Sequence, residues 1–180
     1  MSLYQRFKEE IRQQLKEKLN KKNIHEVPQI EKVIVSMWIW SLVTRKGIKD
    51  FSDLEKNLAT ITGQKPVVVR AKRSVSNFKL REGMPVMLKV TLRWKRAYDF
   101  IDRMIKLYLP RVRDFKGISP KKFDGFGNYN YAFLNQTVFP EINPDDIKTP
   151  MGVQVNIVTT TDSDEEAKVL MESLWFIFEK

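Results

Sequence analysis

The alternation of side chains over residues 86–94 constrains the fold more than any other feature of the chain. One face of this run is apolar and the other is mostly polar: Val86, Leu88, Val90, Leu92 and Trp94 against Met87, Lys89, Thr91 and Arg93. Because successive side chains of a β-strand point to opposite faces, the pattern predicts a strand with one buried face. Such a strand needs partners in a sheet and a second layer that covers its apolar face.

Residues 30–40 alternate in the same way, which predicts a second strand. Shorter β runs are predicted at 66–69, 137–139 and 152–160. The polar side of residues 30–40 becomes apolar at its far end, where Trp38 and Trp40 stand two residues apart. Some other part of the molecule, or a partner, must therefore cover these two indoles.

Four segments carry the periodicity of amphipathic helices. The first spans residues 3–20, and the third spans residues 96–109 and is stopped by Pro110. The second is a short helix that Asp50 or Ser52 can cap and that ends at Gly63. The last helix starts within residues 161–166, where Ser163 and Glu166 have the spacing of a capping box.

The order of these elements predicts an α+β fold, a two-layer sandwich in which a mostly antiparallel sheet carries helices on one face and long basic loops. The length of 180 residues favours a single domain over residues 1–180. Within it we expect an N-terminal helix at 3–20 and basic loops at 70–83 and 110–135.

Charge indicates the class of partner. The chain has 32 Lys and Arg against 22 Asp and Glu, a formal net charge of +10. Proteins with this excess bind polyanions, either nucleic acid or an anionic membrane surface. The excess is concentrated in residues 70–122, which carry about +12, whereas residues 141–180 carry about −6. The acidic C-terminal part would suit a basic protein neighbour by charge complementarity.

Several kinds of chemistry are excluded or disfavoured. The chain has no Cys and a single His, His25, so a thiolate metal site, a cysteine nucleophile and a His-rich metal site are excluded. Asp99 and Asp102 precede Arg103 and Lys106 by four residues, which favours surface ion pairs over a catalytic carboxylate pair.

Two further motifs have structural explanations. Residues 124–128, DGFGN, lack the lysine and spacing of a phosphate-binding loop and favour a tight turn. The acids within residues 162–166 are explained by helix capping rather than by a cation site. We therefore expect no catalytic residue, no metal ligand and no cofactor. The charged N-terminus and the lack of an apolar run of bilayer length predict a soluble cytoplasmic protein with no membrane partner.

Two segments combine cations with aromatic or amide side chains, the mixture that RNA binding requires. The first, the basic loop, contains Arg70, Lys72, Arg73, Asn77, Phe78, Lys79 and Arg81. The alternative for this loop is a solvated surface with a buried Phe78. The second segment contains Arg111, Arg113, Lys116, Lys121 and Lys122, interleaved with Phe115, Phe123, Phe126, Tyr129 and Tyr131. The alternative there is that single aromatics anchor the segment to the core.

A third candidate surface is the polar face of the strands, where Lys89, Thr91 and Arg93 are expected beside Ser36. Open sheet faces carry RNA contacts in several RNA-binding folds. An ordinary solvated sheet face explains the same residues equally well.

The stretch TGQKPVVVRAKRSVSNFKLREGMPVMLKVTLR, residues 62–93, resembles the core signature of bacterial-type large-subunit ribosomal protein five, the 5S rRNA-binding family. The similarity continues in order along the chain. It covers residues 27–37, 109–133, 137–142 and 157–174.

This resemblance implies a structural role in the ribosome, in the cytoplasm of a bacterium or in an organelle of bacterial type. Family members anchor 5S rRNA in the central protuberance and contact large-subunit rRNA, P-site tRNA and a small-subunit head protein, forming an intersubunit bridge. The residues implied in 5S rRNA contact are Ser36, Gln64, Lys65, Thr91 and Arg93. The loop from Ala71 to Gly83 resembles the one that reaches P-site tRNA, and the cations of residues 111–122 are assigned to other rRNA or bridge contacts.

The chain departs from the family pattern in its first strand. Where the family has Asn-Met-Gly-Val-Gly, this chain has Ser36, Met37, Trp38, Ile39 and Trp40. The two indoles either stack on RNA bases or pack against an altered neighbour such as the N-terminal helix. The rival functions are a free-standing RNA chaperone or translational regulator, and an RNA-modifying enzyme or nuclease, for which no acid, base or metal constellation is found.

Overall fold

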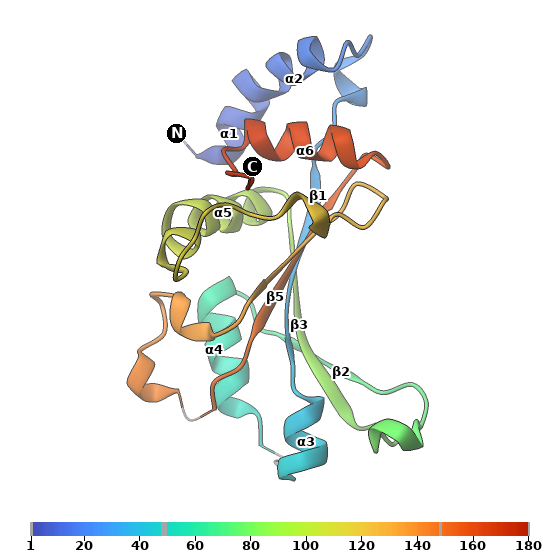
Figure 1. Cartoon of the computed structure of the whole chain (residues 1–180), viewed down its shortest axis with the longest axis vertical. Coiled ribbons are helices and arrows are strands. Elements are labelled where there is room, and N and C mark those ends of the chain that lie inside the picture. Colours follow the sequence, from blue (N-terminus) through green and yellow to red (C-terminus); the bar gives the residue numbers. More distant parts are fainter. Residues whose placement is uncertain (1, 48–49, 148, 180) are drawn as a thin grey trace. The chain divides into compact units, whose positions relative to one another are not determined.

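The computed structural model describes residues 2–47, 50–147 and 149–179 and has the expected α+β fold (Figure 1). Its antiparallel sheet has five strands in the order β2-β3-β1-β5-β4. The strands are β1 (Ile30–Trp38), β2 (Val67–Arg70), β3 (Pro85–Arg93), β4 (Tyr129–Phe133) and β5 (Val153–Thr159). The chain forms two compact units, unit 1 with residues 1–33, 92–131 and 156–180 and unit 2 with residues 34–91 and 132–155. The expectation of a single domain stays a prediction.

Unit 1 begins with the predicted N-terminal helix. It consists of α1 (Leu3–Arg6), a π-helical turn (Phe7–Ile11) and α2 (Arg12–Lys18). A capping box between Ser2 and Gln5 starts it, and the four-residue spacing of its apolar residues buries Leu3, Phe7, Ile11 and Leu15. The helix packs on the two other helices of the unit, α1 against α5 and α2 against α6.

Those helices follow the sequence pattern closely. Helix α5 (Lys95–Arg103) continues through a π-helical turn (Met104–Tyr108) and a 3₁₀ turn (Leu109–Arg111) that contains the predicted terminator, Pro110. Helix α6 spans Asp164–Ser173 and buries Ala167, Leu170 and Met171. Short 3₁₀ turns at Ile24–Glu26 and Pro120–Lys122 complete the helical elements of this unit within the described residues.

Unit 2 contains α3 (Trp40–Lys46), α4 (Ser52–Thr62) and 3₁₀ turns at Ser76–Phe78, Gln136–Val138 and Pro144–Asp146. Helix α4 buries Leu54, Leu58 and Ile61 and ends at Gly63, whose φ of 68° is the left-handed conformation expected there. The Asp50 carboxylate accepts a hydrogen bond from the Ser52 N–H at 3.0 Å, next to the start of α4.

Two sequence predictions about strands are wrong. The strand predicted at 30–40 ends at Trp38, because the backbone turns at Ile39 and Trp40 begins α3. Trp38 and Trp40 have the two-residue spacing of a strand, so the sequence suggested that the alternation continued. Residues 137–139 are not a strand, since a 3₁₀ turn forms where the Asn135 side chain accepts a hydrogen bond from the Thr137 N–H.

Two further details differ from the prediction. Strand β4 lies inside the segment 110–135 that was expected to be a loop, and its alternating burial was obscured by the Gly- and Asn-rich residues before it. The predicted capping box of α6 does not form, because Ser163 makes no side-chain cap and Glu166 instead accepts hydrogen bonds from Lys21 and Thr161.

Neither a membrane span nor a metal cluster is found in the part of the chain that the structure describes. No helix there is both long enough and apolar enough to cross a bilayer. No group of three or more His, Cys, Asp or Glu side chains is placed to hold a metal ion.

Candidate nucleic-acid interface

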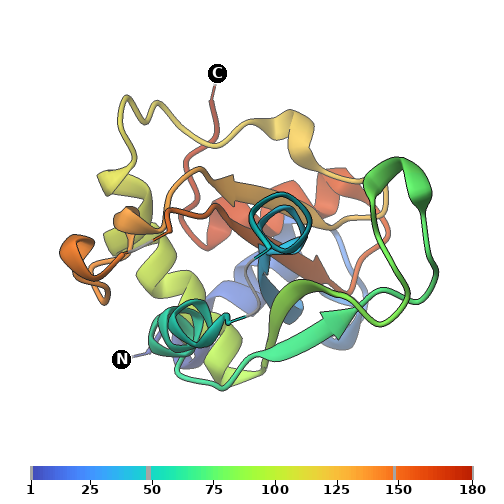
Figure 2. The same cartoon turned by 90° about the horizontal axis from the view of Figure 1, so that it is seen from below.

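The basic loop is a wide hairpin between β2 and β3 in unit 2. The two strands pair antiparallel, and an irregularity at Val69 and Arg70 marks where the loop leaves the sheet. The Ala71 N–H donates to the Met84 carbonyl at 2.8 Å, and Val75 and Leu80 exchange two backbone hydrogen bonds nearer the tip. Figure 2 shows this loop, coloured green, extending well beyond the ends of the two strands.

The cations of the basic loop are exposed and have no acidic partners. Arg70, Lys72, Arg73, Lys79 and Arg81 are all exposed, and within the described ranges none of them forms an ion pair. The Arg70 guanidinium donates to the Gly83 carbonyl at 3.0 Å, across the base of the loop. Within the described residues the loop therefore presents five cations without ion-pair partners, against one acid, Glu82.

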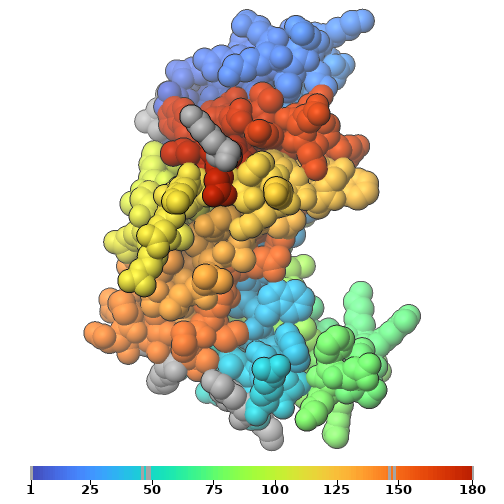
Figure 3. All heavy atoms as spheres, viewed as in Figure 1, coloured from blue at the N-terminus to red at the C-terminus, as the bar shows by residue number. Residues whose placement is uncertain are grey.

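Phe78 is 62% exposed, so the alternative in which it is buried does not hold. Its ring meets the Trp40 indole edge-on, with the ring centroids 6.2 Å apart. Thr44, Arg45, Asn77 and Lys79 line a groove together with these two rings. Figure 3 shows the green side chains of the loop projecting outward beside the atoms of α3. In its own unit Trp40 thus packs on the basic loop.

Trp38, the other indole of the altered strand, has a different environment. Its ring is 47% exposed, and its Nε1–H donates to Gln154 Oε1 at 2.9 Å. Trp38 therefore keeps most of one surface accessible to solvent while its polar edge is fixed to β5.

The segment 110–135 contains the predicted tight turn, which is tied to α6. The Asp124 carboxylate accepts hydrogen bonds from the N–H groups of Phe126 and Asn128 and from the Asn128 side chain. Burial opposes the charged form of Asp124, but these hydrogen bonds outweigh it and lower its pKa. The Asp164 carboxylate accepts from the N–H groups of Gly125 and Gly127 at 3.1 and 2.8 Å.

The cations of this segment are accessible, whereas most of its aromatics are structural. Arg111, Arg113, Lys116, Lys121 and Lys122 are exposed. Tyr129 and Tyr131 point into the core from β4, and Phe123 packs edge-on against Tyr129 at 4.9 Å. The anchoring alternative therefore holds for these rings. Phe126, at the tip of the turn, is 69% exposed and remains available to a partner.

Four of the five residues implied in 5S rRNA contact lie in unit 2. Lys65 is exposed, and Thr91 is half-buried. The Gln64 side chain donates to the Thr91 carbonyl at 3.5 Å, which brings these two residues together. Ser36 is only 3% exposed, so it offers a partner very little surface.

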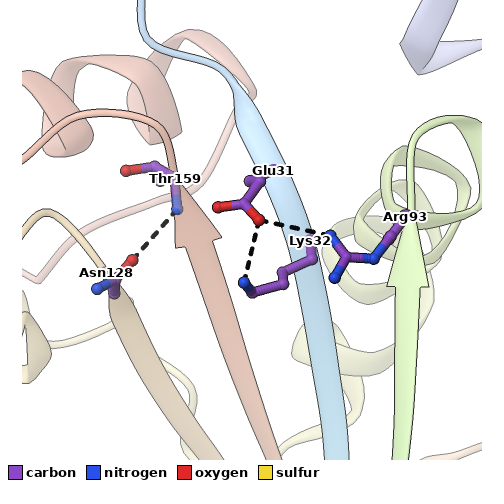
Figure 4. Close-up of polar contacts among 5 residues, drawn as sticks. All are labelled: Glu31, Lys32, Arg93, Asn128 and Thr159. Atoms are coloured by element: carbon purple, nitrogen blue, oxygen red, sulfur yellow. Dashed lines mark hydrogen bonds and ion pairs between the residues drawn. The ribbon is translucent and has the colours of Figure 1, made fainter.

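Arg93, the fifth residue, lies in unit 1 at the end of β3 (Figure 4). Its Nη1 is 3.4 Å from Glu31 Oε1, and the same oxygen accepts from Lys32 Nζ at 3.0 Å. The hydrogen bond from Lys32, with that from Arg93, lowers the pKa of Glu31. One carboxylate thus faces two cations, and positive charge remains in excess at this point.

Sequence reasoning missed three features. Trp94 was expected on the apolar face of a strand, but it follows β3 and is 76% exposed. The alternation up to Leu92 gives no local sign that the strand ends one residue before Trp94. The contact between Trp40 and Phe78 and the clamp made by Asp164 join residues 38 and 37–39 positions apart, so no local pattern reveals them.

An α+β scaffold whose described residues display exposed rings, and exposed cations without ion-pair partners, on two long segments is typical of proteins that bind polyanions. Comparison with known families is more specific. The family described as Ribosomal protein L5 matches residues 23–81, and the ribosomal L5 family C-terminus matches residues 85–178.

Three bacterial relatives show the extent of the similarity, and each is a large ribosomal subunit protein uL5. The protein of Natranaerobius thermophilus is 50% identical over 98% of this chain and 97% of its own length. Those of Thermotoga maritima and Thermus aquaticus are 44% and 43% identical, over 99% and 100% of this chain and 96% and 98% of their own lengths. The chain belongs to the uL5 family of the large ribosomal subunit. It is a constituent of the cytoplasmic ribosome, with ribosomal RNA as a partner, and not an enzyme.

Proposed function

We propose that this protein binds 5S rRNA, anchors it in the central protuberance of the large subunit, and contacts P-site tRNA and a small-subunit head protein. Family membership supports the ribosomal setting. Exposed Lys65 and Arg93 support the contact with 5S rRNA. The contact with tRNA is supported by the exposed cations of the basic loop, which form no ion pair within the described residues. A surface of this kind gains most from phosphate, because binding releases the counterions of the nucleic acid.

The proposed 5S rRNA site consists of Ser36, Gln64, Lys65, Thr91 and Arg93. Lys65 and Arg93 supply charge to phosphates, whereas Gln64 and Thr91 supply hydrogen bonds. Because Ser36 is nearly buried within β1, its share in the contact is small.

The basic loop is assigned to P-site tRNA. Its accessible cations Lys72, Arg73 and Lys79 neutralise phosphates, and the exposed faces of Phe78 and Asn77 contact a nucleotide. The cations of residues 111–122 are assigned to large-subunit rRNA or to the intersubunit bridge. The alternative function, a free-standing RNA chaperone or translational regulator, would use the same cations without preference among RNAs.

Relative affinity tests the main proposal. Binding of the full chain to 5S rRNA, to a tRNA and to an unrelated hairpin of similar length is measured at one near-physiological salt concentration, since such affinities depend on salt. We expect 5S rRNA to bind at least about tenfold more tightly than the other two, a difference of roughly 1.4 kcal/mol. Equal affinities would favour the chaperone.

A loop variant tests whether the basic loop and the proposed 5S rRNA site contact different RNAs. Replacing Lys72, Arg73 and Lys79 with Ala should leave thermal stability and 5S rRNA affinity nearly unchanged, because all three are exposed and lie outside the proposed 5S site. Contact with tRNA on assembled ribosomes should weaken. The matched control removes three other exposed cations, Lys18, Lys22 and Lys56. A loss of 5S rRNA binding in the loop variant alone would contradict the site assignment.

A further inference from the structure

Trp94 occupies an unfavourable position in two respects. The residue is 76% exposed, and its backbone has φ 52° and ψ −131°. This is the mirror image of the β region, which only glycine enters readily. A bulky residue that keeps such a conformation at the surface sacrifices stability, and strain of this kind is concentrated at functional sites.

The indole borders a cleft of unit 1 whose floor is apolar and whose rim is cationic. Tyr4, Phe7, Ile30 and Tyr98 contribute the rings and aliphatic surface. Lys8, Arg12 and Arg93 contribute the positive charge, against a single acid, Glu31. The volume of about 180 Å³ is below the about 300–1,000 Å³ of pockets for drug-sized ligands. The cleft is therefore of a size for one planar group rather than for a larger ligand.

The first turn of α5 adds to the positive charge. It contains Lys95 and Arg96 and no acidic residue, although the N-terminal end of a helix is its positive end and favours acids. Trp94 is the residue that precedes this turn, and its carbonyl accepts hydrogen bonds from the N–H groups of Ala97 and Tyr98. Lys8 and Arg12 at the cleft rim and Lys95 at the helix start together favour an anion in this part of unit 1.

Trp175 shows that exposure and a positive φ do not by themselves indicate a site. It also lies in unit 1, with φ 71° and 44% exposure, but the Arg6 guanidinium covers its ring at 4.0 Å. Within the described residues, the ring of Trp94 has no such cation and no aromatic neighbour. Trp175 thus resembles Trp94 in backbone and exposure, but its ring already has a partner within the chain, Arg6.

We propose that Trp94 is a stacking platform for one unpaired base of 5S rRNA, with Lys8 and Arg12 on the adjoining phosphates. Every base has a π-face that an indole can cover. Lys8 and Arg12 line the same cleft as Trp94 and are placed to neutralise the phosphates next to that base. Charge complementarity selects RNA as the occupant, because the cleft has three cations against one acid. The inference rests on the proposed 5S rRNA binding and adds a residue and a mode of contact to it.

Stability and affinity should change in opposite directions in Trp94→Gly. The glycine relieves the backbone strain, so the midpoint of thermal unfolding should rise by roughly a few degrees. The affinity for 5S rRNA should fall by about 5- to 150-fold, the usual loss for one stacked base. Trp94→Phe should retain most of the affinity. In the matched control, Trp175→Gly, the 5S rRNA affinity should be unchanged.

Fluorescence locates the contact in the intact chain. Replacing Trp38, Trp40 and Trp175 with Phe leaves Trp94 as the only indole. Binding of 5S rRNA should quench the emission of Trp94, and the bound RNA should make its indole less accessible to acrylamide. If 5S rRNA binds but Trp94→Gly binds equally well and the emission is constant, the stacking proposal is wrong and the proposed function stands. If the wild-type chain does not bind 5S rRNA, the proposed function itself fails. Quenching on self-association without RNA would identify a second copy as the occupant and overturn the proposal.

Discussion

At the scale of single residues, Asp164 connects two distant parts of unit 1. Its carboxylate accepts from the N–H groups of Gly125 and Gly127, which hold the tight turn against the start of α6. Gly127 itself is confined, because a Cβ there would lie 2.2 Å from the Thr161 carbonyl oxygen. Two features therefore fix this turn: the close packing of its backbone on that of Thr161, and the hydrogen bonds to the Asp164 carboxylate.

Replacing Asp164 with Ala should lower the free energy of unfolding by about 1–3 kcal/mol, because two backbone N–H groups lose a charged acceptor. Urea denaturation measures the change. The matched control is Asp162→Ala, two residues away and exposed, which should stay within about 0.5 kcal/mol of the wild type. Equal effects of the two substitutions would show that the clamp contributes nothing specific.

Individual residues were predictable where a local rule governs them. Gly63 has the left-handed conformation that the end of a helix demands, and Asp102 pairs with Lys106 at 2.7 Å, as the four-residue spacing predicts. Glu166 was expected to cap α6, but Lys21, 145 positions away, supplies a stronger donor. A rule based on spacing does not include a competing partner that only the tertiary fold provides.

At the scale of elements, the N-terminal helix is fixed to α6 by an ion pair just beyond its end. Lys21 Nζ lies 2.5 Å from Glu166 Oε1, and both side chains are about three-quarters buried. The hydrogen bond from Lys21 is the main reason that the pKa of Glu166 is lowered, and a hydrogen bond from Thr161 adds to it. Burial of Glu166 opposes this shift but is outweighed.

The stability of the protein should therefore depend on Glu166 in acid. Its folded pKa lies below the ordinary value of 4.5, so the unfolded chain binds the proton more readily. The contribution is complete above about pH 4.5 and is lost as the pH falls through the folded pKa. Urea denaturation from pH 6 to about pH 3 should give a flatter profile for Glu166→Gln than for the wild type. The control Glu165→Gln, on an exposed neighbour, should keep the wild-type slope. Parallel profiles for wild type and Glu166→Gln would refute the coupling.

Helix α3 and the basic loop form a second pair of elements, joined through Trp40 and Phe78. An aromatic pair contributes about 0.5–1.5 kcal/mol beyond its buried area, so Trp40→Ala should loosen the loop. Cleavage by trypsin at Arg73 and Lys79 should become about 2- to 10-fold faster. Trp38→Ala, whose indole bonds to Gln154 instead, should leave the cleavage rate unchanged. An unchanged rate in Trp40→Ala would mean that the loop is held by its backbone alone.

The sequence predicted elements well where periodicity extends over many residues. The N-terminal helix, β3, α4 and α5 lie within a few residues of their predicted positions. Strand β4 and helix α3 were missed because five to seven residues carry little periodic signal, and the aromatic pair before α3 suggested a continued strand. The same limit applies to the candidate site. Its cations could be predicted from the sequence, whereas the contacts of its indoles depend on the tertiary fold and could not.

At the scale of the whole molecule, the excess of positive charge dominates the proposed binding to RNA. An interface built on phosphate contacts weakens with salt in proportion to the number of contacts. Lys65→Ala should therefore lower the affinity for 5S rRNA and reduce the slope of log affinity against log salt by roughly 0.7–0.9. Lys56→Ala, on an exposed face of α4 outside the proposed site, should leave the slope unchanged. A full wild-type slope for Lys65→Ala would remove Lys65 from the phosphate contacts.

Reconstitution tests whether this chain anchors 5S rRNA in the large subunit. Large subunits depleted of their uL5 protein and of 5S rRNA are incubated with purified 5S rRNA, with or without this chain, and the 5S rRNA that sediments with the particles is measured. If the chain anchors 5S rRNA, 5S rRNA returns to about one copy per particle only when the chain is present. Particles that take up the chain and still lack 5S rRNA, or that regain 5S rRNA equally well without the chain, would contradict it.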